Sequence, residues 1–60
     1  MMNNEDVDME QLSETENFTI FRTRDEDGLI YHIEMGGITL HLVPEEWEEF
    51  VLLVKGADAA

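Results

Sequence analysis

Cysteine is absent from this chain of 60 residues. Disulfides and thiolate–metal sites, the usual staples of small domains, are therefore excluded. A chain of this length forms at most one domain, and it buries too small a share of its surface to be very stable alone. Idealised packing or association with another chain must supply the remaining stability.

Positive charge is scarce as well. Fifteen acids stand against Arg22, Arg24 and Lys55, which gives a formal net charge of −12. This balance makes a nucleic-acid ligand unfavourable, because such ligands are held mainly through cationic surfaces, and it disfavours anionic membranes. Three explanations stay open: halophile-like adaptation to high salt, complementarity to a basic protein partner, and imitation of a polyanion.

Long apolar runs and catalytic signatures are both missing. The longest apolar run, residues 50–54, is too short to span a bilayer, and the acidic start does not resemble a signal peptide. We therefore expect a cytoplasmic protein without membrane contact. Ser13 is the only serine, and Gly36-Gly37 is a turn signal rather than a phosphate loop. We expect no enzymatic activity and no cofactor.

A β-hairpin is the strongest pattern that is present. Gly36-Gly37 separates two alternating segments, and glycine accepts the positive φ of a type I′ or II′ turn. Closing the chain there places His32 opposite His41. One face of the hairpin is then wholly apolar, comprising Tyr31, Ile33, Met35, Ile38, Leu40 and Leu42. The other face carries both histidines.

A further strand and a helix flank the hairpin. Residues 18–24 alternate and are rich in β-branched and aromatic residues, which predicts a strand. The turn at residues 25–28 pairs Arg24 with Leu29 or, if tighter, shifts the pairing by two without exchanging the faces. A helix is predicted over 44–55, starting at Pro44 and stopping at Gly56. Its apolar stripe comprises Trp47, Phe50, Val51 and Val54.

The predicted fold class is therefore α+β, a three-stranded antiparallel β-meander followed by one C-terminal helix packed on its apolar face. This β-β-β-α domain spans 18–56. Residues 1–17 are predicted to be a disordered acidic tail, in which residues 5–12 could form a helix against a partner. Residues 57–60 are expected to fray.

Two apolar surfaces do not fit a lone monomer. The histidine face carries large apolar groups with few charges, and the helix has leucines outside its stripe. Exposed apolar patches of this kind usually mark interfaces, so we expect a homodimer or an obligate partner. The pairing could be sheet against sheet or edge to edge, the latter giving six continuous strands. The candidate interface comprises Phe21, Ile30, His32, His41, Val43, Leu52 and Leu53.

The two histidines could also form a site. Opposed cross-strand residues lie close enough for His32 and His41 to share a zinc ion, with Glu34 as a third ligand. They could instead simply cover the face, with His32 stacked on Phe21. A pH-sensitive interface is a third reading, because two neighbouring histidines resist joint protonation.

Charged side chains suggest further surfaces. Arg22 and Arg24 either pair with the acids at 25–27 or, with Phe21 and Tyr31, form a small nucleic-acid platform. The acidic helix face is either solvated or a partner surface, and it comprises Glu45, Glu46, Glu48 and Glu49. The leading expectation is a non-enzymatic protein–protein interaction or regulatory module that acts as a homodimer. The alternative is a polyanion mimic that inhibits a basic nucleic-acid-binding protein.

One short pattern resembles a known family. Gly37-Ile-Thr-Leu followed by Pro44-Glu-Glu-Trp47 resembles the end of the PC4-type transcriptional coactivator fold, in which a last strand runs into a helix. The resemblance implies a dimer built on a meander and a helix, with single-stranded DNA bound on its sheets. This chain has extra residues between Leu40 and Pro44 and lacks the basic strands of that family.

Overall fold

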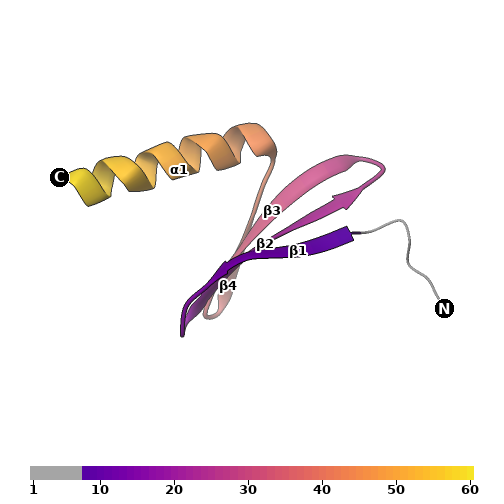
Figure 1. Ribbon diagram of the computed structural model, residues 1–60, viewed down its shortest axis with the longest axis horizontal. Helices are drawn as coiled ribbons and strands as arrows, with labels where there is room; N and C mark the ends of the chain where they lie inside the picture. Colours follow the sequence, from indigo (N-terminus) through magenta and orange to yellow (C-terminus); the bar gives the residue numbers. More distant parts are fainter. Residues whose placement is uncertain (1–7) are drawn as a thin grey trace.

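The chain forms one antiparallel sheet and one helix in the computed structural model, which describes residues 8–60 (Figure 1). The strands are β1 (Asp8–Glu14), β2 (Phe18–Asp25), β3 (Gly28–Met35) and β4 (Ile38–Leu42), and the helix is α1 (Pro44–Ala59). The strands follow one another in the sheet in chain order, so the topology is a meander. The predicted α+β class and the C-terminal helix are confirmed.

The predicted number of strands is wrong, because residues 8–60 form four rather than three. The additional strand, β1, lies in the segment expected to be a disordered tail, and residues 8–12 are extended rather than helical. All seven β1 residues are exposed, so the strand is held by backbone pairing with the edge of β2 and not by burial. Residues 1–7 of the expected tail lie outside the described residues.

A turn that the sequence analysis missed joins β1 to β2. The Thr15 backbone N–H donates to the Phe18 carbonyl at 2.8 Å, and the Phe18 N–H donates to Thr15 Oγ1 at 3.2 Å. A bulge at Leu12 shifts the β1–β2 register between Gln11 and Ser13. Bulges twist a strand and hinder further pairing at a sheet edge.

The two predicted hairpins have the expected registers. His32 lies opposite His41 in β3–β4, and Arg24 lies opposite Leu29 in β2–β3. Gly36 has φ of 67° while Gly37 has no positive φ, so the β3–β4 turn fits type II′. The two faces of the sheet therefore carry the side chains that the alternation predicted.

Helix α1 begins where the sequence predicts but continues further. Val43 has no polar side chain to cap the helix, and Glu46 accepts a hydrogen bond from the Val43 N–H at 3.3 Å instead. The helix passes through Gly56 and ends at Ala59, so the predicted end at residue 55 with a stop at Gly56 is wrong. Ala57 and Ala59 are strong helix formers, and they outweigh the cost of one glycine.

Little of this structure is buried. Ile33, which is 4% exposed, is the one buried hydrophobic side chain among the described residues. Trp47 joins α1 to the sheet by stacking on Tyr31, with ring centroids 4.7 Å apart and planes 2° apart. Beyond this contact the helix diverges from the sheet toward its C-terminal end (Figure 1). The helix and sheet enclose an open wedge rather than a packed core.

Candidate functional site

The face of the sheet opposite α1 holds a compact cluster around His32. The Phe21 and His32 rings are stacked with centroids 4.5 Å apart, and the His41 ring meets His32 edge-on at 4.9 Å. Thr23 Oγ1 lies 2.9 Å from His32 Nε2, within hydrogen-bond distance. Adjacent strands β2, β3 and β4 each supply part of this cluster through the registers described above.

The cluster lowers the pKa of His32. Partial burial beside Phe21 is the main cause, because it disfavours the charged imidazolium, and the neighbouring His41 acts in the same direction. Glu34 opposes the change by favouring the cation. His32 is therefore more readily kept neutral than a free histidine at mildly acidic pH.

A metal site remains a prediction. His32 and His41 are brought together as expected, but within residues 8–60 no group of three or more histidine, cysteine, aspartate or glutamate side chains is placed to hold a metal ion. Glu34 is thus not placed as a third ligand, and Thr23 already occupies the neighbourhood of His32 Nε2. The stacking of His32 on Phe21, which was the alternative reading, matches the observed geometry.

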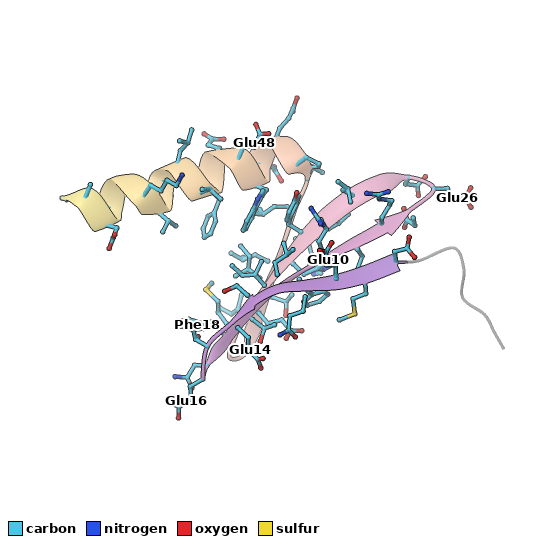
Figure 2. All side chains as sticks on the ribbon, in the orientation of Figure 1. Glu10, Glu14, Glu16, Phe18, Glu26 and Glu48 are labelled. Carbon is cyan, nitrogen blue, oxygen red and sulfur yellow. The ribbon has the colours of Figure 1, made fainter. Side chains whose placement is uncertain are left out.

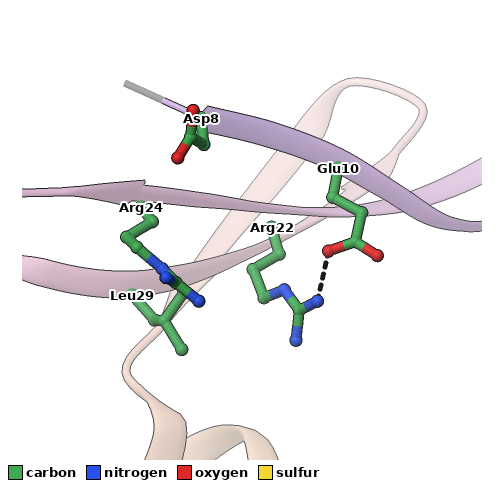
Figure 3. A pocket seen from close by; sticks show the side chains of 5 residues that line it. All are labelled: Asp8, Glu10, Arg22, Arg24 and Leu29. Carbon is green, nitrogen blue, oxygen red and sulfur yellow. Dashed lines mark hydrogen bonds and ion pairs between the residues drawn. The ribbon is translucent and has the colours of Figure 1, made fainter. Parts of the chain in front are cut away.

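Arg22 is engaged by a residue outside its expected acidic partners. It forms an ion pair with Glu10 of β1, and its guanidinium carbon lies 5.9 Å from the Tyr31 ring centroid. The hydrogen bond that the Arg22 guanidinium donates to the Glu10 carboxylate is the largest cause of a raised pKa at Arg22. Arg22 lines a hollow together with a second arginine and two acids, so the charges around the hollow are balanced (Figure 3). Its lining comprises Asp8, Glu10, Arg22, Arg24 and Leu29.

The acidic helix surface is fully open. Its four glutamates are exposed and lie in the first two turns of α1, and the helix dipole favours the negative charge of the two in the first turn, Glu45 and Glu46. Glu48 lies on a flank of α1 and not on its sheet-facing side (Figure 2). These four carboxylates therefore form a continuous charged surface at the N-terminal half of α1, comprising Glu45, Glu46, Glu48 and Glu49.

The middle of α1, residues 50–54, is apolar on all sides. Leu52 and Leu53 are each 68% exposed on the outside of the helix. The inner side lines an open groove toward the sheet, which we call the helix–sheet wedge. It is lined by Ile20, Trp47, Phe50, Val51, Val54 and Lys55. Phe18 and Ile38, on the same face of the sheet, are 52% and 59% exposed.

The predicted interface residues therefore fall on different surfaces. Phe21, Ile30, His32 and His41 share the helix-free face of the sheet, whereas Leu52 and Leu53 lie on the far side of α1. Val43, which is 43% exposed, lies at the junction between β4 and α1. No single flat contact can cover both groups.

Sequence reasoning missed the contribution of β1 and the floor of the wedge. Glu10 was missed because its segment was expected to be disordered, although the Thr15-Glu16-Asn17 turn residues before Phe18 are a usable signal. Ile20 and Phe18 lie on the sheet face toward α1, but the divergence of α1 leaves Ile20 only partly covered and Phe18 exposed.

Comparison with known proteins adds no family to this geometry. No protein-family model, curated protein or solved structure matches the chain. Within residues 8–60, no helix has both the length and the apolar character needed to cross a membrane.

Proposed function

We propose that this chain is a small acidic interaction module that acts as a homodimer and regulates a partner through protein–protein contact, without catalysis. One observation carries the proposal: Ile33 is the single buried apolar side chain in residues 8–60, while large apolar groups are exposed on α1 and on the sheet. Apolar burial is the main favourable term in folding. A chain that buries so little alone gains its stability from a second chain.

The acidic surfaces support a basic protein as the regulated partner. All thirteen acidic side chains in the described part of the chain are exposed, and four of them gather on the first turns of α1. Opposite charge speeds association and selects partners more than it raises affinity. The apolar surfaces thus serve self-association, and the acidic helix surface serves recognition.

The chemistry of the described side chains favours binding over catalysis. His32 and His41, the groups best suited to proton transfer, line neither the hollow beside Arg22 nor the helix–sheet wedge. The His32 ring also stacks on Phe21, and its Nε2 lies within hydrogen-bond distance of Thr23 Oγ1. We therefore assign the histidine cluster to the architecture of the face and to its response to pH.

A polyanion mimic is the second candidate, because four glutamates cluster on one side of the first two turns of α1. Such an inhibitor competes with nucleic acid for a basic protein, and salt abolishes its binding. A partner-specific module also uses its apolar contacts and retains part of its affinity at high salt.

The first test is the solution mass by light scattering after size exclusion, at low and at molar salt. We expect a dimer at both salt concentrations. A stable monomer at both would contradict the homodimer. A dimer formed only at high salt would instead favour halophile-like adaptation as the reason for the charge.

The second test uses a lysine-rich peptide as a probe of the acidic surface. We expect weak, salt-sensitive binding that is lost when Glu45, Glu46, Glu48 and Glu49 are changed to glutamine. Changing the acids of the β2–β3 turn, Asp25, Glu26 and Asp27, to their amides is the matched control and should preserve most of the binding. Binding of a single-stranded oligonucleotide in place of the peptide would contradict this assignment and favour a nucleic-acid function of the PC4 type.

A further inference from the structure

We infer that the helix–sheet wedge is the self-association site and that its occupant is the apolar middle of α1, residues 50–54, from a second copy, with the two helices antiparallel. The inference rests on the homodimer proposed above and specifies its geometry. In this arrangement the two sheets lie outside and the two helices lie between them.

Apolar side chains surround the whole circumference of α1 at its middle. Residues 50–54 are five consecutive apolar residues, and at 100° per residue they surround the helix completely. A helix that is apolar on all sides is normally buried on all sides. Yet α1 has no buried residue, and Leu52, Leu53 and Val54 are 68%, 68% and 48% exposed. Its own sheet can cover only one side.

The uncovered surfaces of the wedge and of α1 match one another. The wedge has an apolar helix side and an apolar floor, formed by Ile20 and extended by the exposed Phe18 and Ile38. A helix in this space must be apolar on two opposite sides. Residues 50–54 of α1 meet that requirement: their inner side contacts the first α1, and Leu52 and Leu53 contact the floor. Two-fold symmetry fills both wedges at once.

The charge distribution along α1 allows so acidic a chain to pair with itself. The glutamates of α1 lie in its first two turns, whereas residues 50–60 carry only Lys55 and Asp58, whose charges cancel. An antiparallel pair sets the acidic turns of each helix beside the nearly neutral C-terminal half of the other, which avoids most of the repulsion. It also leaves Glu45, Glu46 and Glu49 at the two ends of the helix pair, open to a basic partner.

Charge also selects the antiparallel direction. Glu48 and Lys55 are seven residues apart and lie on the same flank of α1. An antiparallel pair related by a two-fold axis places each Lys55 beside the partner's Glu48, whereas a parallel pair places the two lysines together. The helices then cross between Val51 and Leu52.

The experiment measures distances in the full-length dimer, and the absence of cysteine makes single labelling sites available. Spin labels are placed separately at Glu45, Asp58 and Thr39, each changed to cysteine. We expect the Glu45 pair and the Asp58 pair each to be separated by about 20 Å along the helix axis, from a rise of about 1.5 Å per residue. The Thr39 pair should be at least as far apart, because the two sheets are on opposite sides of the helices.

Two other geometries give different results and would overturn the inference. Parallel helices place both helical label pairs at a similar short distance, about 10 Å apart. Edge pairing through β4 brings the two Thr39 labels within about 10 Å. Either result with a dimeric mass contradicts only this geometry, whereas a monomer at all concentrations contradicts the proposed homodimer as well.

Charge exchange tests the register independently of the labels. Lys55→Glu should weaken dimerisation at low salt at least tenfold, and adding Glu48→Lys should restore it. The matched control combines Lys55→Glu with Glu49→Lys, which gives the same net charge on a different flank and should not restore it. Equal rescue by both double variants would contradict the antiparallel register.

Discussion

At the scale of single residues, His32 makes the stability of the fold depend on pH. Burial against Phe21 and the nearby His41 lower the pKa of His32 in the folded protein below its ordinary value of 6.5. The unfolded chain therefore binds a proton at a higher pH than the folded chain does. The resulting stability is fully present above pH 6.5 and is lost as the pH falls through 6.5 toward the lower folded pKa.

This linkage gives the first prediction. Thermal unfolding of the natural chain and of His32→Gln should diverge between pH 7.5 and pH 5.5, with the natural chain losing more stability on acidification, because only it carries the titrating ring. The comparison with the variant removes the common contribution of the carboxylates, whose protonation relieves repulsion. His41→Gln is the control and should retain most of the pH slope, since burial is the larger cause at His32. Parallel curves for the natural chain and His32→Gln would refute the assignment.

Trp47 is the residue that fastens the helix to the sheet. Its indole stacks on Tyr31 and lies 6.3 Å from the Phe50 ring centroid. We predict that Trp47→Ala destabilises the fold by about 3 kcal/mol, the lower end for a large aromatic residue, because the ring is only partly covered. Trp47→Phe keeps a stacking partner and should cost less than half as much. Urea unfolding followed by circular dichroism measures both, and equal stability of the natural chain and Trp47→Ala would show that α1 is held elsewhere.

At the scale of elements, the effect of a glycine on stability depends on whether it ends a helix or lies inside one. A glycine at a helix stop has positive φ, and alanine there is unfavourable, whereas a glycine inside a helix is destabilising relative to alanine. Gly56 lies inside α1, has no positive φ, and a Cβ added there would meet nothing within 4 Å. We predict that Gly56→Ala stabilises the protein by about 0.5 to 1 kcal/mol. Gly36→Ala, at φ of 67°, should be destabilising and serves as the contrast. Thermal unfolding measures both, and a destabilised Gly56→Ala would restore the interpretation of Gly56 as a stop.

The hairpins and β1 show what could be predicted from the sequence. The β3–β4 hairpin was predictable in register because its alternation, its Gly36-Gly37 turn and its buried Ile33 all require the same pairing. Strand β1 was not predictable in this way, because none of its side chains is buried and its acids have low strand propensity. Strand β1 forms because its backbone pairs with the edge of β2. The edge that makes this possible belongs to β2 and cannot be seen in the sequence of β1. The ion pair of Arg22 with Glu10 was missed for the same reason.

At the scale of the whole molecule, two opposed features decide whether two copies associate. The exposed apolar groups of α1 and of the sheet favour association, and a net charge of −12 on each copy opposes it. The charge repulsion is long-ranged and screened by salt, whereas apolar burial is local. Concentrating the acids on the first turns of α1 and in the β2–β3 turn keeps most of the repulsion away from the wedge. The molecule can thus be strongly acidic and still bring two wedges together.

If folding and association are coupled in this way, unfolding depends on protein concentration. Each hundredfold increase in concentration should stabilise the folded dimer by about 2.7 kcal/mol, which raises the Tm by about 10 °C for a dimer of this size. Molar salt should raise the Tm at every concentration, because it screens the repulsion between the two copies. Circular dichroism melts over a hundredfold concentration series, at low and molar salt, measure both effects. A Tm that does not change with concentration would mean that one copy is stable with its wedge empty, and a different partner chain would then be needed to explain the exposed apolar residues of α1.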